Sequence, residues 1–223
     1  MTWAKICGNT SLEDAQLALD LGADALGFIF AESKRRITPA QAAAITSNLP
    51  KQVERVGVVY SRDADEIVAI VQEAGLTAVQ LHGGMDLVLV DHLRERLGAK
   101  VSLIQTLHWV VGTDSSEKLR SELNEIATAG TVKRVLIDSR VGAAGGGTGV
   151  SFDWEAARSL FVEAAAKDLH IIVAGGLRPD NVAEAIHQLK PWGVDVSSGV
   201  EASPGRKDPE KVAAFLRIAK TAP

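Results

Sequence analysis

Short apolar runs alternate with longer amphipathic stretches along this chain. The runs are rich in Val, Ile, Leu and Ala. The stretches open on polar residues and space their apolar residues by three and four, which is typical of helices. This alternation predicts repeated β-α-β units in a parallel sheet. The predicted strands cover residues 4–7, 25–30, 55–59, 78–81, 101–106, 134–138, 171–174 and 194–197. Because eight parallel strands close a (β/α)8 barrel, we expect an α/β protein with that TIM-barrel fold.

Residues at the predicted helix starts support this pattern. Ser11 and Asp63 precede stretches with early acidic residues, as expected of side chains that cap a helix N-terminus. Pro39 and Pro179 suit the first turn of a helix, where the missing N–H of proline breaks no hydrogen bond. No Ser/Pro-rich linker or shift in composition divides the chain, so we expect residues 1–223 to form a single domain.

The composition excludes several classes of protein. With 223 residues and 46% hydrophobic content, the chain can bury a large core. Its net charge of −4 gives no general attraction to nucleic acid, and its apolar runs are too short to span a membrane. The single cysteine, Cys7, allows no internal disulfide, and the start resembles no secretory signal, so we expect a cytoplasmic protein. The five histidines show no metal-ligand spacing, so no metal site is expected.

Three of the predicted strands end in polar residues or glycines, at Cys7, at Asp138 and at the pair Gly175 and Gly176. In a parallel barrel the carboxyl ends of all strands meet on one face, which carries the active site. Loops after the seventh and eighth strands commonly hold phosphate through backbone N–H groups, and small residues permit that close approach. The alternative is that these glycines only make tight turns. The predicted phosphate-binding residues are Gly175, Gly176, Ser198 and Gly199.

A glycine-rich segment, residues 139–149, follows Asp138 directly. It carries glycines at 142, 145, 146, 147 and 149, which predicts a long loop on the catalytic face. We expect this loop to be either a mobile cover over the substrate or an ordinary surface loop. No Gly-Lys-Ser/Thr follows the glycines, so the segment is not a P-loop.

Six motifs occur in order between Lys5 and about residue 208. They are Lys5-Ile6-Cys7-Gly8, Gly27-Phe28-Ile29-Phe30 with Ser33-Lys34-Arg35, Val79-Gln80-Leu81-His82-Gly83, Leu136-Ile137-Asp138, Gly175-Gly176-Leu177, and Asp195-Val196-Ser197-Ser198-Gly199-Val200-Glu201. As a set they resemble phosphoribosylanthranilate isomerases of tryptophan biosynthesis. The resemblance implies an Amadori rearrangement of N-(5-phosphoribosyl)anthranilate to 1-(2-carboxyphenylamino)-1-deoxyribulose 5-phosphate. It also implies a small phosphorylated substrate and no metal or organic cofactor.

The same resemblance assigns the proton transfers to Cys7 as general base and Asp138 as general acid. A free thiol, with a pKa of about 8.5, is mostly protonated at pH 7 and needs a nearby donor, cation or helix end. Lys5 is close in sequence, but we expect it to point to the opposite side of its strand and do not assign it this role. A carboxyl with a pKa of about 3.9 must be shifted by desolvation or nearby negative charge to hold a proton near neutrality.

Other residues are assigned to the substrate by resemblance. Arg35 is expected to pair with the anthranilate carboxylate, which suits a planar guanidinium fork. The neighbouring Arg36 leaves open which arginine reaches inward, and we prefer Arg36 as a surface charge. Gln80 and His82 share one side of a strand and are expected to line the pocket, although a structural role for His82 is also open.

Three other readings compete with this one. The histidine-pathway isomerase of the same fold is similar, but its site is built on two aspartates, whereas this chain has Cys7 at the first strand end. A metal-dependent sugar-phosphate epimerase fits less well, because the strand ends of this chain do not supply the metal ligands. A noncatalytic phosphometabolite-binding barrel remains open, because fold does not fix function. The chain is expected to act as a monomer or homodimer, and Trp109 is a candidate exposed association patch.

Overall fold

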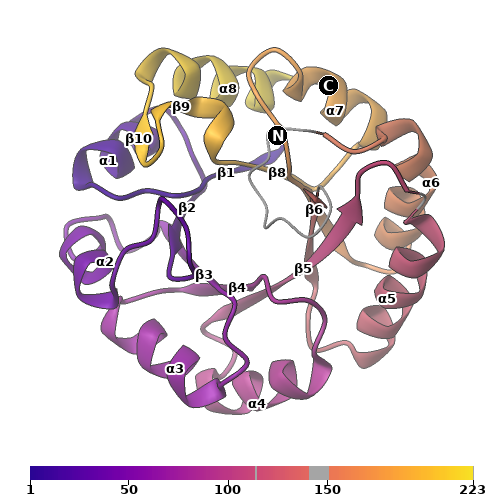
Figure 1. Ribbon diagram of the computed structural model, residues 1–223, viewed down its shortest axis with the longest axis horizontal. Coiled ribbons are helices and arrows are strands. Elements are labelled where there is room, and N and C mark those ends of the chain that lie inside the picture. The colour runs from indigo at the N-terminus through magenta and orange to yellow at the C-terminus, as the bar shows by residue number, and fades with distance from the viewer. Residues whose placement is uncertain (114, 141–150, 223) are drawn as a thin grey trace.

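The computed structural model describes residues 1–113, 115–140 and 151–222. Eight parallel strands close a barrel in chain order, and the helices form a ring outside it, which confirms the predicted fold (Figure 1). The strands are β1 (Trp3–Ile6), β2 (Ala25–Ile29), β3 (Glu54–Val59), β4 (Ala78–Leu81), β5 (Ser102–Val110), β6 (Arg134–Arg140), β7 (His170–Val173) and β8 (Gly193–Val196). The helices are α1 (Leu12–Asp20), α2 (Pro39–Thr46), α3 (Ala64–Glu73), α4 (Leu87–Leu97), α5 (Ser116–Ala129), α6 (Trp154–Ala165), α7 (Val182–Leu189) and α8 (Pro209–Thr221).

A small addition follows the last barrel strand. It consists of the 3-10 turn η1 (Ser198–Val200) and an antiparallel pair, β9 (Glu201–Ser203) and β10 (Arg206–Lys207). Pairing of β1 with β8 joins the beginning of the barrel to its end. No helix in the described ranges is long and apolar enough to cross a membrane.

The helix starts follow the sequence signals with one exception. Ser11 and Asp63 are N-caps whose side chains accept backbone N–H bonds, and Pro39 is the first residue of α2. Pro179 was expected in the first turn of a helix, but α7 begins later and has Asn181 as its N-cap. The Asn181 side chain accepts the N–H of Arg178, which closes a turn around Pro179 and delays the helix.

Strand β5 is longer than its sequence pattern predicted. It remains paired with β6 as far as Val110, where the prediction ended the strand at residue 106. Trp109 therefore lies within a strand, is 2% exposed, and stacks on Phe152 with ring centroids 5.3 Å apart. The expectation of an exposed association patch at Trp109 was wrong, because the ring packs between the barrel and the helices.

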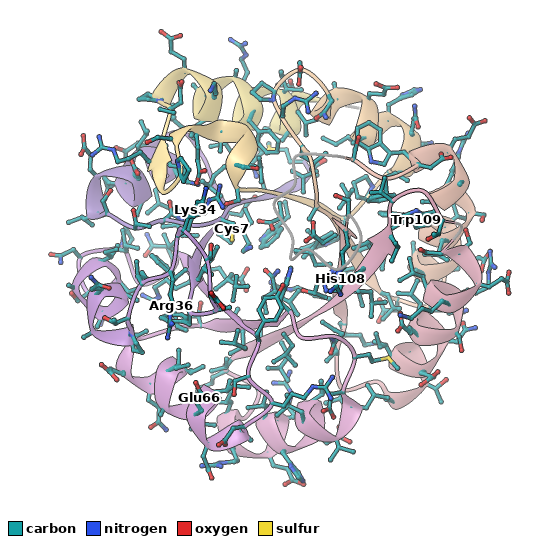
Figure 2. The ribbon with its side chains drawn as sticks, viewed as in Figure 1. Cys7, Lys34, Arg36, Glu66, His108 and Trp109 are labelled. Atoms are coloured by element: carbon teal, nitrogen blue, oxygen red, sulfur yellow. The ribbon has the colours of Figure 1, made fainter. Side chains whose placement is uncertain are left out.

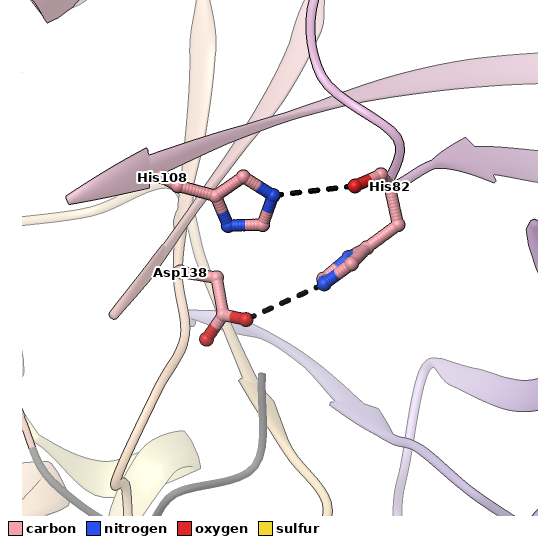
Figure 3. Close-up of side chains that lie close together, drawn as sticks. All are labelled: His82, His108 and Asp138. Atoms are coloured by element: carbon pink, nitrogen blue, oxygen red, sulfur yellow. Dashed lines mark hydrogen bonds and ion pairs between the residues drawn. The ribbon is translucent and has the colours of Figure 1, made fainter. Parts of the chain in front are cut away.

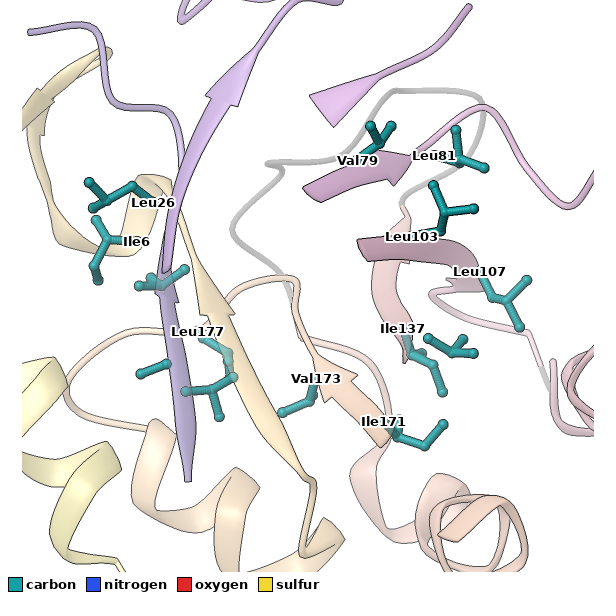
Figure 4. Close-up of a cluster of buried hydrophobic side chains, with 14 of the residues drawn as sticks. Ile6, Leu26, Val79, Leu81, Leu103, Leu107, Ile137, Ile171, Val173 and Leu177 are labelled. Carbon is teal, nitrogen blue, oxygen red and sulfur yellow. The ribbon is translucent and has the colours of Figure 1, made fainter. Parts of the chain in front are cut away.

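Alternation along the strands divides the buried side chains into two groups. Residues such as Leu26, Val79 and Ile137 point outward and pack under the helices, which makes the larger core (Figure 4). The inward residues form a separate apolar cluster at the floor of the barrel, against which Trp3 and Trp192 pack. The floor cluster consists of Ala25, Val56, Ala78, Ile104, Leu136, Ile172 and Ala174.

Candidate active site

A pocket opens at the carboxyl ends of the strands, above the floor cluster, where parallel barrels bind their ligands. Every residue that the sequence assigned to catalysis, substrate or phosphate lines this pocket, although those residues come from six separate strand ends and loops. They are Cys7, Arg35, Gln80, His82, Asp138, Gly175, Gly176, Ser198 and Gly199.

Asp138 lies on β6 with its side chain inside the barrel, and the residue is only 6% exposed. Burial, together with the charge of Asp195, raises the pKa of the Asp138 carboxyl to about 7, although Lys5 opposes the shift. The Asp138 carboxyl is therefore about half protonated near neutrality. A carboxylic acid in this state can give a proton to a bound ligand.

Cys7 follows directly after β1, and its backbone N–H bonds Val196 O at 2.8 Å, which fixes it beside β8. Gly27 on the neighbouring strand makes room for its thiol, because a Cβ there would lie 2.6 Å from Cys7 Sγ. Burial raises the pKa of the Cys7 thiol above its ordinary value, while Lys5 and Lys207 act in the opposite direction. Cys7 is therefore mostly a thiol at neutral pH.

The structure corrects the expectation for Lys5. Lys5 and Cys7 are two positions apart, so a period of two puts both side chains on the same side of β1, inside the barrel. Lys5 is fully buried, and its Nζ donates to Gln80 Oε1 and to Asp195 Oδ1, each at 2.9 Å. Burial alone would lower the pKa of Lys5, but Asp195 and Cys7 raise it to about 12, so Lys5 is a cation.

Gln80 and His82 continue this polar layer along β4. Gln80 Nε2 lies 3.3 Å from His82 Nδ1, and His82 Nε2 lies 3.5 Å from Asp138 Oδ2. Burial, with the charges of His108 and Lys5, lowers the pKa of His82 to about 3. His82 is therefore a neutral imidazole throughout the physiological range.

The side chains of His82, His108 and Asp138 form a cluster that the sequence spacing did not reveal (Figure 3). One potential ligand atom from each lies within 4.8 Å of the others. Neither nitrogen of His82 is available to a metal ion, because Nδ1 accepts from Gln80 and the proton of the neutral ring is then on Nε2. His108 Nε2 lies 3.2 Å from the carbonyl oxygen of His82 and must donate to it. We therefore assign this cluster to proton and hydrogen-bond chemistry.

The adjacent arginines differ in their surroundings. Arg35 lines the pocket, and its Nε and Nη2 bond the two carboxylate oxygens of Glu201 at 2.7 and 2.6 Å. Arg36 is exposed and lies outside the barrel (Figure 2). Glu201 also pairs with Lys207, whose Nζ bonds Cys7 O at 2.6 Å. The sequence assigned no role to Glu201 or Lys207, because Arg35 and Cys7, the partners that connect them to the pocket, lie 166 and 200 residues away along the chain.

The predicted phosphate-binding glycines sit in crowded turns. A Cβ at Gly175 would lie 2.0 Å from Ser139 Oγ, and one at Gly199 would lie 1.9 Å from the carbonyl oxygen of Leu177. Close packing alone therefore excludes a side chain at both positions. The predicted lid, with its glycines at 142–149, lies outside the residues that the structure describes apart from its first two residues.

Cys7 and His108 lie around the centre of the barrel, whereas Trp109 lies further out (Figure 2).

Residues 4–217 match the family model described as N-(5'phosphoribosyl)anthranilate (PRA) isomerase. The N-(5'-phosphoribosyl)anthranilate isomerase of Pelobacter propionicus is 43% identical, over 99% of this chain and 96% of the relative. The phosphoribosyl anthranilate isomerase structure from Thermotoga maritima has 35% identity and a TM-score of 0.83, with 99% of each chain covered.

A further solved structure carries a ligand. It is a phosphoribosyl anthranilate isomerase in complex with reduced 1-(o-carboxyphenylamino)-1-deoxyribulose 5-phosphate. It is 34% identical to this chain, has a TM-score of 0.79, and is matched over 99% of each chain.

Proposed function

Because the chain belongs to the family of N-(5'-phosphoribosyl)anthranilate isomerases, which are isomerases of tryptophan biosynthesis, we propose that Asp138 and Cys7 carry its proton transfers. The reaction is the Amadori rearrangement of N-(5-phosphoribosyl)anthranilate to 1-(2-carboxyphenylamino)-1-deoxyribulose 5-phosphate. The observation that carries the proposal is the buried Asp138 carboxyl with a pKa of about 7, in the same pocket as the Cys7 thiol. The Asp138 carboxyl has the proton affinity that acid catalysis near neutrality needs.

Asp138 acts as the general acid in the first step. Its proton moves to the furanose ring oxygen of the substrate while the bond between that oxygen and sugar carbon 1 breaks. The electron pair on the anthranilate nitrogen forms the protonated Schiff base. Asp138 is left as a carboxylate, at 3.5 Å from the neutral ring of His82.

Cys7 acts as the general base in the second step. Its thiolate removes the proton from sugar carbon 2, and the electrons of that C–H bond form the enolamine while the Schiff-base nitrogen becomes neutral. The enolamine then gains a proton at sugar carbon 1 and loses the proton of the carbon-2 hydroxyl, which gives the ketone product. Since burial keeps Cys7 mostly protonated, the active form of the pair, acid protonated and thiolate ionised, is a minor species at any pH. Activity therefore follows the pool of singly protonated pairs, which is largest between the two pKa values.

The ends of the substrate are held by different elements. Arg35, oriented by Glu201, binds the anthranilate carboxylate, and the loops after β7 and β8 bind the phosphate through backbone N–H groups. Gln80 and His82 line the sugar between them, and the reaction needs no cofactor.

We also propose that residues 1–223 are one domain acting in the cytoplasm as a monomer or homodimer. A related structure from Thermotoga maritima contains monomers generated from a dimeric enzyme.

The direct test is the loss of anthranilate fluorescence when freshly made phosphoribosylanthranilate is added to wild type, Cys7→Ser and Asp138→Asn. We expect turnover by the wild type and loss of it in both variants, with ligand affinity and folding retained. Arg35→Gln should raise KM, and the exposed neighbour variant Arg36→Gln serves as its matched control. A folded wild type that binds the ligand without turning it over would contradict the assignment and favour a binding protein.

A further inference from the structure

Lys5 is the buried cation of this site, and it contacts both halves of the proposed machinery. Its Nζ donates to Gln80 Oε1 and Asp195 Oδ1 at 2.9 Å, and its Cε borders the same space beside Gly27 as Cys7 Sγ. An ammonium group has three N–H donors, so one remains to face the Cys7 sulfur when the thiol ionises. The side chain is 0% exposed, which fixes the cation beneath the pocket.

The Lys5 bond determines which way Gln80 faces. Because an ammonium only donates, the oxygen of the Gln80 amide must point at Lys5, and its NH₂ then points at His82 Nδ1, 3.3 Å away. His82 Nδ1 consequently accepts, and the single ring proton is on Nε2. That Nε2–H faces Asp138 Oδ2 at 3.5 Å (Figure 3).

We propose that Lys5 is a positioning residue shared by the base and the acid. From its place beside Cys7, on the same side of β1, it stabilises negative charge on Cys7 Sγ when the thiol ionises. Through Gln80 and His82 it keeps a neutral N–H directed at the Asp138 carboxylate that remains after proton transfer. This inference deepens the proposed function and depends on it, since Cys7 and Asp138 are the base and acid named there.

The role of Lys5 at Cys7 can be tested because charges of opposite sign surround the thiol, so removing them should shift its pKa in opposite directions. Lys5 and Lys207 face Cys7 as cations, and Asp195 faces it as an anion. If the ion pair between Lys5 and Asp195 were purely structural, removing either partner would abolish the same contact, and both variants would change the pKa of the Cys7 thiol in the same way. A group that acts on Cys7 through its charge gives opposite shifts for the two variants.

The experiment is the pH dependence of Cys7 alkylation by iodoacetamide in the substrate-free protein. Cys7 is the only cysteine in the sequence, so the label reports this thiol alone. We expect Lys5→Met to raise the apparent pKa of the thiol by about one unit or more, and Asp195→Asn to lower it. The exposed Lys34→Met variant, which removes a cation next to Arg35 in the sequence, is the matched control and should leave the thiol pKa unchanged.

Lys5→Met leaves Asp195 buried without a counter-charge, so its folding is checked beside the double variant Lys5→Met/Asp195→Asn, which removes both charges. In the double variant the two opposed shifts offset each other, so its thiol pKa should lie above that of Asp195→Asn alone. An unchanged thiol pKa in folded Lys5→Met, a double variant equal to Asp195→Asn, or shifts of the same sign for both single variants would overturn the role at Cys7.

The second arm uses the ¹⁵N shifts of the His82 ring and needs no turnover. The wild type should show a neutral ring protonated on Nε2, and Gln80→Met should give a mixture of tautomers with kcat/KM lowered roughly tenfold. A wild-type ring protonated on Nδ1 would overturn the relay. Since neither alkylation nor the NMR shift requires catalysis, failure of this inference is distinguishable from failure of the proposed isomerase chemistry.

Discussion

The interior of the barrel has two layers of opposite character, built by the same strands. The floor cluster is apolar and closed, with Ile104 and Ile172 at 0% exposure. Further along four of the strands, β1, β4, β6 and β8, the inward positions are Lys5, Gln80, Asp138 and Asp195, also nearly inaccessible but charged or polar. The second layer is stable only because each of its groups has a partner, since an unpaired charge inside a protein is costly.

The difference explains where the shifted pKa values come from. Every residue of the floor cluster is at most 4% exposed, so the polar layer rests on apolar side chains from which water is excluded. Desolvation raises the pKa of Asp138 and lowers that of His82. The apolar layer thus contributes to the acid–base properties of the layer above it.

The largest expected effect is on catalysis in the polar layer. In the proposed mechanism Asp138→Asn removes the proton that opens the furanose ring, and we expect kcat/KM to fall about 10²–10⁴-fold, or about 3–5 kcal/mol of transition-state stabilisation. Steady-state fluorescence assays check this, together with calorimetry of ligand binding. A loss of less than tenfold would remove Asp138 from the acid role.

A substitution in the floor cluster should lower the stability of the fold and leave catalysis largely unchanged. Ile104→Ala leaves a cavity in a fully buried position and should cost about 2–5 kcal/mol of unfolding free energy, measured in urea. The chemistry of the pocket should continue, with kcat close to that of the wild type at low temperature. Ile104→Val, expected to cost about 0.5–1.5 kcal/mol, is the graded control. A large drop in kcat without a loss of stability would show that the two layers are not separable.

The pH dependence of stability offers a third comparison. Asp138 keeps its proton to about pH 7 in the folded protein, whereas an unfolded aspartate loses it near pH 3.9, so this group destabilises the fold progressively between those values. His82 has the opposite sign, because its folded pKa of about 3 makes stability rise between about pH 3 and 6.5. Asp138→Asn removes only the first effect. Its stability advantage over wild type should grow from pH 4 to 7 and reach as much as about 4 kcal/mol. An advantage that stays constant in urea titrations from pH 5 to 8 would argue against the raised pKa.

A fourth comparison is between two crowded glycines, Gly27 inside the barrel beside Cys7 and Gly57 on its outer side. Gly27→Ala puts a Cβ 2.6 Å from Cys7 Sγ and 3.0 Å from Lys5 Cε, so both groups must move. A displacement of this kind should reduce kcat/KM by about 10²-fold. The control is Gly57→Ala, equally crowded but against Leu76 on the outside of β3, which should lower stability and spare kcat. Equal kinetic effects of the two substitutions would contradict the geometry.

The smallest effect is expected below the floor. Arg134 pairs with Glu54 and lies over the rings of Trp3 and Trp192, at 5.8 and 5.2 Å from their centroids. Arg134→Met should cost about 1–2 kcal/mol of stability through these partly exposed contacts, with no change in kcat. Thermal unfolding and the fluorescence assay measure the two quantities. A change in KM would show that the lower face communicates with the pocket.

The sequence predicted those features that depend on local pattern. The alternation of strands and helices, with capping residues such as Ser11 and Asp63, predicted the barrel. The polar residues at the strand ends predicted which residues line the pocket. Lys5 was misassigned although the signal was present, because its spacing of two from Cys7 places both on one side. Other features depend on tertiary contacts and leave no local trace. The extension of β5 past residue 106 depends on Trp109 packing against the distant Phe152.

The His82, His108 and Asp138 cluster likewise follows from strand register, since β5 pairs His108 with Asp138. A search for ligand spacing within one segment cannot find groups that come from three strands. The arrangement becomes visible only when the order and register of the barrel are known.

The pairing of β1 with β8 has a consequence for the growing chain. Lys5 emerges first from the ribosome, and its partner Asp195 is 190 residues later. Until the last strand is synthesised, Lys5 has no counter-charge and Cys7 has no neighbouring β8 to hold its backbone. The site therefore cannot assemble during translation, and its appearance marks closure of the barrel. An enzyme built this way is inactive in every truncated form that stops before β8.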